Sequence, residues 1–278
     1  MAYSEQYIVV SKSCKASLCT LKLHDGVNET TVKIWDLKEP PNVGAIIYID
    51  GGILGEKVFA DRIRLIQTEV EKGHPLYKYV PHATEREEWD RCIEALIAQC
   101  TDDQLIPLIR EYADKLYGPY AKYPAATSVH HAFPGGLLVH TYQMLHMLEG
   151  LYPCLPYEGV KLERCVLAIL FHDYGKLYEY DYNGNTQQPM YLLGHIFISS
   201  NRLREQLLAH DIPDEEIDRI VHIVLAHHGQ LEYGSPIMPA TQEAIIVNHL
   251  DNLSAKTDCI YWASNGERVF ALGTNAVK

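Results

Sequence analysis

Five histidines and two aspartates beyond residue 130 are spaced in a pattern that suits metal binding. They occur singly or as adjacent pairs in five consecutive segments that have a helical period. Any one of these histidines alone would be interpreted as a core or helix-end residue that hydrogen-bonds within the protein. Neutral imidazoles and carboxylates together suit Mn, Fe, Co, Ni or Zn, whereas an all-oxygen set would favour Mg or Ca. The candidate ligands are His140, His172, Asp173, His195, His227, His228 and Asp251.

The adjacent pair His172 and Asp173 follows the apolar run "LAILF". A carboxylate beside a core loses its hydration, so something has to compensate its charge. We predict that Asp173 bridges two divalent ions. Two ions about 3.5 to 4 Å apart can activate a water and stabilise the entering and leaving oxygens of an in-line phosphoryl displacement. The predicted ligand sets are His140, His172 and Asp251 for one ion, and His195, His227 and His228 for the other.

Gly175 and Lys176 come next in "FHDYGK". Helices commonly end in a left-handed residue, often glycine, so we expect Gly175 to end the helix in this way. Lys176 would then lie beside the ions and hold a substrate phosphate, with a solvated surface lysine as the alternative. Asp173 and Lys176 are therefore the candidate catalytic residues. On the loop "SVHHAFPGG", His131 is expected either to contact the substrate or to order the loop.

Helices have to position these side chains. Thr84 and Glu87 have the spacing of a capping box and would open the first helix. His140 has the same helical phase as Met144 and Met147, so it points toward the apolar side. The predicted helices span residues 84–100, 102–118, 137–150, 161–174, 192–209, 214–228 and 240–258.

Residues before about 70 show a period of two and are rich in β-branched side chains. Five short strands suit a small closed barrel, for which the OB-fold is the five-stranded candidate and an SH3-like barrel the alternative. In "TTVKIWD", Thr31, Lys33 and Trp35 share one strand face. Lys33 and Trp35 are candidate substrate-binding residues because an aromatic ring can stack a base while a lysine meets its phosphate. The alternative is that Trp35 packs at the end of the barrel.

The sequence therefore predicts a multidomain α+β chain. Residues 1–72 would form a five-stranded OB-like β-barrel that binds nucleic acid, residues 73–83 a linker containing Pro75 and Pro81, and residues 84–278 an all-α domain.

The net charge of −12 counts against electrostatic binding of nucleic acid, which relies on Lys and Arg. Residues 1–80 contain ten Lys and Arg and ten Asp and Glu, so the remainder carries the whole deficit. Bound divalent cations can rebalance such an acidic, histidine-rich region.

The start of the chain lacks signal-peptide features and no apolar run approaches about 18 residues, so we expect no membrane segment and a cytoplasmic location. Seven cysteines without a CxxC predict free thiols rather than a disulfide framework. Cys14 and Cys19 could share a metal, but we interpret them as ordinary strand residues.

The order H...HD...H...HH...D resembles the HD-domain metal-dependent phosphohydrolases that bind two metals. The strings "HHAFPGGLLVHT", "FHDYGK", "LLGHI", "LAHHGQLEYGSP" and "EAIIVNHLDNL", after an OB-like "VKIWD", resemble the YhaM-type 3'-5' exoribonucleases over roughly residues 6–272. This resemblance implies an OB-fold fused to an HD domain and manganese-favoured cleavage of single-stranded RNA, and often DNA, to nucleoside monophosphates. By position, it carries the ligand roles onto the seven residues named above.

Two features depart from the family pattern. Ser254 stands where the family tends to have an acidic residue, and the C-terminus is shortened and lacks an aromatic extension. The main alternative function is an HD-type phosphohydrolase or phosphodiesterase that acts on a small nucleotide. A binding protein without chemistry and a di-iron oxygenase on the same ligands are the further alternatives. The expected partner is single-stranded nucleic acid, with RNA favoured, and a homo-oligomer stays open.

Overall fold

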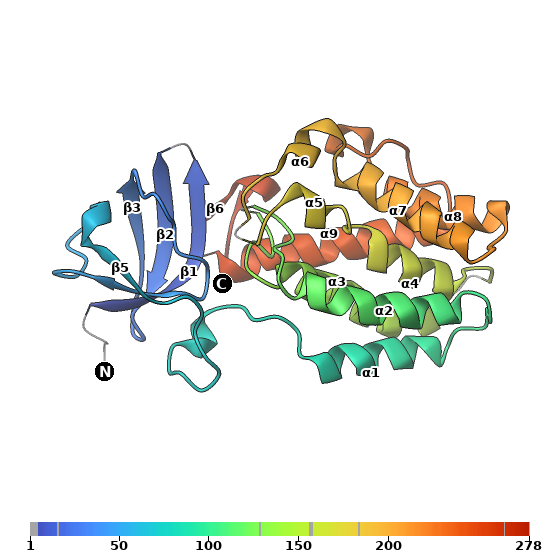
Figure 1. The fold of residues 1–278 in the computed structure, drawn as a ribbon, viewed down its shortest axis with the longest axis horizontal. Helices are drawn as coiled ribbons and strands as arrows, with labels where there is room; N and C mark the ends of the chain where they lie inside the picture. Colours follow the sequence, from blue (N-terminus) through green and yellow to red (C-terminus); the bar gives the residue numbers. More distant parts are fainter. Residues whose placement is uncertain are drawn as a thin grey trace.

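The computed structural model describes residues 5–15, 17–127, 129–155, 158–182, 184–263 and 265–277. A sheet occupies the N-terminal part of the chain and helices occupy most of the rest (Figure 1). None of the helices in the described ranges is both long and apolar enough to cross a membrane.

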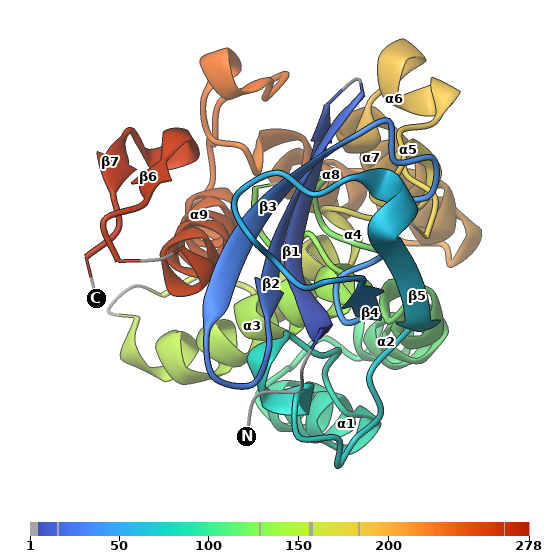
Figure 2. The same cartoon turned by 90° about the vertical axis from the view of Figure 1, so that its left-hand side faces the viewer.

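The N-terminal sheet has five antiparallel strands in the order β3-β2-β1-β4-β5. Alternate residues such as Leu21, Val32, Ile34 and Ile47 point into one core, which follows from the period of two in the sequence. Figure 2 shows this sheet nearest the viewer, in front of the helices. The strands are β1 (Gln6–Lys15), β2 (Leu18–His24), β3 (Glu29–Trp35), β4 (Ile46–Ile49) and β5 (Ile63–Gln67).

The predicted closed barrel is not confirmed, because β3 and β5 are the two edges of an open sheet. Near the β3 edge the described chain has only an isolated parallel bridge between Lys33 and Lys57. The two hydrogen bonds there run from Lys33 N to the carbonyl of Glu56 (2.6 Å) and from Val58 N to the carbonyl of Lys33 (3.1 Å). The burial pattern of β3 agrees with the predicted exposed face, since Val32 and Ile34 are buried while Thr31 and Trp35 are exposed.

Cys14 and Cys19 lie opposite each other in the β1–β2 ladder and form a disulfide. The prediction that all cysteines are free thiols is therefore wrong for this pair, because the hairpin register brings together two residues that are five apart in sequence. Cys92, Cys100, Cys154, Cys165 and Cys259 are free.

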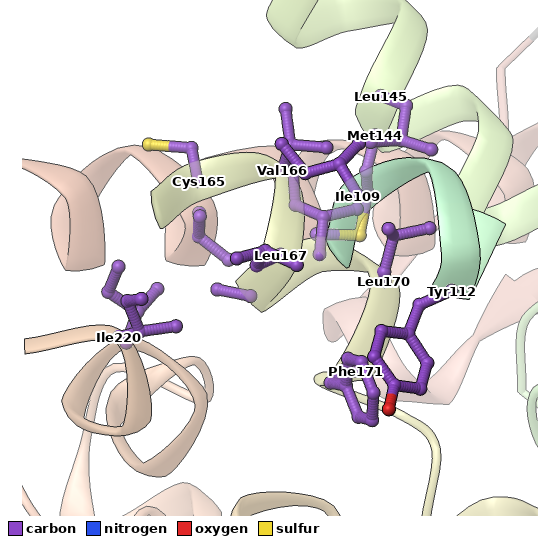
Figure 3. Close-up of a cluster of buried hydrophobic side chains, with 14 of the residues drawn as sticks. Ile109, Tyr112, Met144, Leu145, Cys165, Val166, Leu167, Leu170, Phe171 and Ile220 are labelled. Carbon is purple, nitrogen blue, oxygen red and sulfur yellow. The ribbon is translucent and has the colours of Figure 1, made fainter. Parts of the chain in front are cut away.

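The helical part is built around α4 (Leu162–Phe171), in which all ten residues are buried. Figure 3 shows Leu167 and Leu170 of α4 among side chains from neighbouring helices, including Ile109 of α2 and Met144 of α3. The other long helices are α1 (Arg86–Ile97), α2 (Ile106–Tyr120), α3 (Gly136–Leu151), α7 (His195–Ala209), α8 (Asp214–Ala226) and α9 (Gln242–Trp262). Two short helices, α5 (Lys176–Glu179) and α6 (Gln188–Leu192), and a two-stranded sheet of β6 (Arg268–Val269) and β7 (Thr274–Asn275) complete the main elements.

Three local predictions are wrong. Helix α1 begins at Arg86 after Glu85, without a side-chain cap, so Thr84 and Glu87 form no capping box. The helix predicted over 192–209 is interrupted by Gly194, whose φ of 74° separates α6 from α7. Gly175 has a right-handed backbone with φ of −60° and not the expected left-handed one.

Candidate metal centre

The adjacent pair His172 and Asp173 is buried because it directly follows the buried helix α4. The chain turns here, and the carbonyl of Asp173 accepts from Lys176 N (3.0 Å), where α5 begins. Two other candidate positions also lie at helix ends: His195 is the first residue of α7, and His227 directly follows α8. Helix ends therefore bring side chains from distant parts of the sequence to one place.

The first predicted ligand set comes together in the structure. His140 Nε2 lies 3.2 Å from Asp251 Oδ1 and 3.2 Å from His172 Nε2. One ligand atom from each of the three residues lies within 4.8 Å of the others. The three residues come from α3, from the end of α4 and from α9.

The second predicted set also forms a compact group. Ligand atoms of His195, His227 and His228 lie within 4.8 Å of one another. The Nε2 atoms of His195 and His228 are 3.4 Å apart. This group joins the start of α7 to the end of α8.

Asp173 lies between the two groups, with one oxygen facing each. Its Oδ2 is 3.3 Å from His172 Nε2 and 3.8 Å from His140 Nε2. Its Oδ1 is 3.7 Å from His195 Nε2 and 4.0 Å from His227 Nε2. The arrangement is that of a carboxylate placed to bridge two cations.

Each of the five imidazoles is held through its Nδ1 by an acceptor outside the two groups. Three of these acceptors are backbone carbonyls, one is the Glu179 carboxylate and one is the Ser254 hydroxyl. A proton on Nδ1 leaves Nε2 as a lone pair that points inward, which is how metal-ligating histidines are usually oriented. The contacts are His172 to Ile169 O (2.8 Å), His227 to Val224 O (2.6 Å), His228 to Tyr233 O (2.8 Å), His195 to Glu179 Oε1 (3.2 Å) and His140 to Ser254 Oγ (2.9 Å).

This orientation leaves lone pairs facing one another. His140 and His172 present Nε2 atoms 3.2 Å apart with no proton between them when both rings are neutral. Of the buried side-chain atoms in the described ranges, Asp173 Oδ1 and His227 Nε2 have no hydrogen-bond partner. Buried polar atoms rarely go unpaired. Two ligand atoms that are each about 2.1 Å from a shared ion are separated by a distance close to the 3.2 Å between these Nε2 atoms. The donor set therefore fits divalent transition metals at both positions.

Charges within the centre shift several pKa values. Burial would raise the pKa of Asp173, but Lys176 and then His172 outweigh it and hold that pKa well below its usual range. Burial would lower the pKa of His172, yet the neighbouring Asp173 carboxylate raises it overall. Burial, followed by the nearby His228 and His172, lowers the pKa of His227 well below its usual range. Asp173 is thus ionised, and His227 is a neutral imidazole available as a ligand.

Lys176 is not a solvated surface lysine. It is buried, and its Nζ lies 2.7 Å from Asp173 Oδ2. Gly175, one residue earlier, is needed for a close approach: a Cβ there would lie 2.5 Å from the Cα of His195. Its N–H donates to Ser199 Oγ (2.8 Å), so the turn after α4 packs directly against the start of α7.

Sequence reasoning missed the residues that orient the ligands. Glu179 is buried, and its Oε1 accepts from the backbone N–H of His195 (2.6 Å) as well as from the ring. Ser254 donates to Gln143 Oε1 (2.7 Å), so its oxygen is free to accept from His140. Glu179 follows the candidate residue Lys176 by three positions, and an acidic residue at this spacing is the signal that could have identified it.

His131 is buried, and its ring lies next to the His140 ring of this centre. Its Nε2 donates to Gln143 Oε1 (3.1 Å), and its backbone N–H donates to Asp258 Oδ2 (2.7 Å). These contacts favour loop ordering, the second of the two predicted roles, over substrate contact. Burial followed by nearby charged groups lowers the pKa of the adjacent His130 to about 3.

Lys33 and Trp35 lie on β3 of the sheet and are not part of the centre. Trp35 is 41% exposed, and Lys57 Nζ lies 5.4 Å from the centroid of its ring. Lys33 Nζ pairs with Glu56 (3.1 Å).

Residues 137–256 match the family model of the HD domain. This stretch contains all seven candidate ligands, and α1 and α2 lie before it. HD domains bind divalent metals, and the match supports a metal-dependent phosphohydrolase. No solved structure matches the chain.

Proposed function

We propose that this chain, in which the HD domain indicates a metal-dependent hydrolase, is a two-metal 3'-5' exonuclease that degrades single-stranded RNA to nucleoside monophosphates. The observation that carries the proposal is the placement of Asp173, with its Oδ2 toward His140 and His172 and its Oδ1 toward His195 and His227. The donor chemistry favours transition metals, and the YhaM-type resemblance favours manganese.

Two bound divalent ions would supply a nucleophilic water and charge stabilisation on the phosphodiester oxygens. The chain's own residues do the rest. Asp173 spans the two positions, and the five imidazoles are fixed by their Nδ1 contacts before any ion binds. His195, His228 and Asp251 are the partly exposed members, and the side chains of His195 and Asp251 are 17% and 15% exposed, so substrate would enter on this side.

Lys176 is proposed to act next to Asp173. The 2.7 Å contact holds its ammonium group at the carboxylate that would bridge the ions. A phosphate bound at the ions would meet this positive charge, which can stabilise the charge that develops on the phosphate oxygens.

The sheet is proposed to bind the strand upstream of the scissile bond. Trp35 offers an exposed ring, with Lys57 over it and Lys33 on the same strand face. A ring next to lysines can stack a base and contact its phosphate without sequence preference. The antiparallel order β3-β2-β1-β4-β5 is compatible with an OB-like domain.

The alternative is a phosphohydrolase or phosphodiesterase acting on a small nucleotide. The net charge of −12, which residues 81–278 carry, favours it. In that case the sheet would serve assembly or regulation.

The two functions are separated by substrate and product. The protein is incubated with Mn²⁺ and a 5'-labelled oligoribonucleotide, with a 3'-blocked copy, and with free nucleotides. The proposal expects a ladder that shortens from the 3' end, release of nucleoside monophosphates and no cleavage of the blocked copy. Hydrolysis of free nucleotides with an intact oligonucleotide would establish the alternative instead.

A second test addresses the sheet. Trp35→Ala removes one stacking platform worth about 1–3 kcal/mol, so the KM for the oligonucleotide should rise roughly 5-fold to more than 100-fold. Cleavage of a small chromogenic phosphodiester should not change. Phe270→Ala is the matched control, because its ring is 87% exposed and lies in the C-terminal segment. Equal KM values for wild type and Trp35→Ala would remove the proposed role of the sheet.

A further inference from the structure

A separate group of metal-binding side chains lies between α1 and α3. Cys92 comes from α1, and His146 and Glu149 come from α3. One ligand atom from each residue lies within 4.8 Å of the others, and His146 Nδ1 is 3.1 Å from Glu149 Oε2. His146 follows His140 by six residues, or about 240° around the helix, so it faces away from the HD centre.

The two helices hold these side chains at the edge of the core. Cys92 is 4% exposed and belongs to the buried face of α1. Glu149 is three residues after His146, which places both on one side of α3. The ring of Tyr142, one turn earlier, stacks on the His146 ring with an interplanar angle of 5°.

We propose that Cys92, His146 and Glu149 bind a Zn²⁺-class cation. Sulfur, imidazole nitrogen and carboxylate oxygen are the three donor types that zinc takes, whereas Mg²⁺ and Ca²⁺ prefer all-oxygen sets. Three side chains leave one of four tetrahedral positions open, and water reaches it because the His146 side chain is 64% exposed.

The chemistry of the cysteine narrows the choice of ion. A cysteine binds a cation as the thiolate, so the ion has to displace the proton of the Cys92 thiol. Zinc and cobalt bind thiolates strongly enough to do this, and the proton is released on binding. The ion would tie α1, which precedes the matched HD stretch, to α3, the helix that carries His140.

Cobalt gives a test that does not depend on hydrolytic activity. The HD centre offers only nitrogen and oxygen ligands, so a sulfur-to-cobalt charge-transfer band in the near ultraviolet reports a cysteine ligand. We expect Co²⁺ to produce this band in the wild-type protein and Zn²⁺ to abolish it by competition. The band should disappear in Cys92→Ser and in His146→Ala, and the bound metal should fall by a single equivalent in each.

Three controls make the result decisive. Cys154→Ser should keep the band, because Cys154 is exposed and lies outside the cluster. The double variant Asp173→Asn/Lys176→Met should keep it, because it removes the bridging carboxylate of the HD centre without leaving Lys176 buried and unpaired. His146→Ala alters an exposed side chain, so circular dichroism should show an intact fold. The proposal is overturned by absence of the band from the wild type at excess Co²⁺, by its persistence in His146→Ala or by its loss in Cys154→Ser.

Discussion

The buried carboxylate of Glu179 gives the sharpest test of the metal centre, because it touches one ligand group and not the other. Its Oε1 accepts from the backbone N–H of His195 (2.6 Å) and from His195 Nδ1 (3.2 Å). In Glu179→Gln, the amide oxygen can keep the backbone contact. The amide NH₂ then takes the place of Oε2, which also lies 3.2 Å from His195 Nδ1, so this nitrogen faces a donor and is favoured as an acceptor. The proton moves to Nε2, and His195 no longer offers a lone pair to the centre.

The expected loss of metal affinity in Glu179→Gln follows from the free energy needed to return His195 to the tautomer that binds the ion. Binding a cation would require the contact between the introduced amide and the His195 ring to break and leave a buried donor unpaired, at a cost of about 1–3 kcal/mol. Loss of such an outer partner typically weakens metal affinity 10- to 100-fold. We therefore expect one Mn²⁺ per chain to bind 10- to 100-fold more weakly in Glu179→Gln and the other to be nearly unchanged.

The measurement is a titration in which the electron paramagnetic resonance signal of free Mn²⁺ reports the bound fraction. Ser254→Ala is the reciprocal variant, since Ser254 Oγ holds His140 Nδ1 (2.9 Å) and should affect the opposite ion. In a double-mutant cycle, Glu179→Gln should add to Ser254→Ala but not to His228→Ala, which damages the same group. Equal weakening of both ions by Glu179→Gln, or no weakening at all, would refute the assignment of the ligands to two groups.

Three further outcomes are expected. Gly175→Ala should lower the free energy of unfolding by about 1–3 kcal/mol in urea titrations, because the new Cβ meets the backbone at the start of α7. Asp173→Asn should abolish binding of both ions. It should also destabilise the metal-free protein by about 3–5 kcal/mol, because Lys176 loses its buried partner. Adding Lys176→Met should restore the stability but not the metal binding. Burial lowers the pKa of His222. As the pH falls below about 6.5, the unfolded chain takes up a proton that the folded chain does not yet bind, so the free energy of unfolding decreases toward low pH. His222→Gln should flatten this fall in chemical denaturation with EDTA.

The candidate ligands could be predicted from the sequence because each lies in phase with a strong local pattern. The apolar run of α4 leads directly into His172 and Asp173, so their burial follows from the sequence alone. The helical phase of His140 likewise points it toward the core. Each of these sequence patterns lies within one helix, and His140, His172 and Asp173 are buried as the patterns predict.

The supporting residues could not be predicted because their partners lie far away in the sequence. Ser254 Oγ meets His140 across 114 positions, and no local period encodes that contact. Gly175 looked like a helix terminator, yet its actual constraint is the approach of His195 from another helix. Closure of the sheet similarly depends on the β3 edge meeting residues 56–58, where the ladder is limited to one bridge.

The two oxygens of Asp173 are not equivalent, and this difference predicts the order in which the ions bind. Oδ2 already has the Lys176 ammonium group at 2.7 Å, whereas Oδ1 has no hydrogen-bond partner. The other unpaired buried atom, His227 Nε2, belongs to the group that faces Oδ1. A cation bound there relieves two unpaired buried groups, each costing about 1–3 kcal/mol, while a cation on the Oδ2 side competes with Lys176. The first ion should therefore bind at His195, His227 and His228, so Glu179→Gln should weaken the first binding step and Ser254→Ala the second.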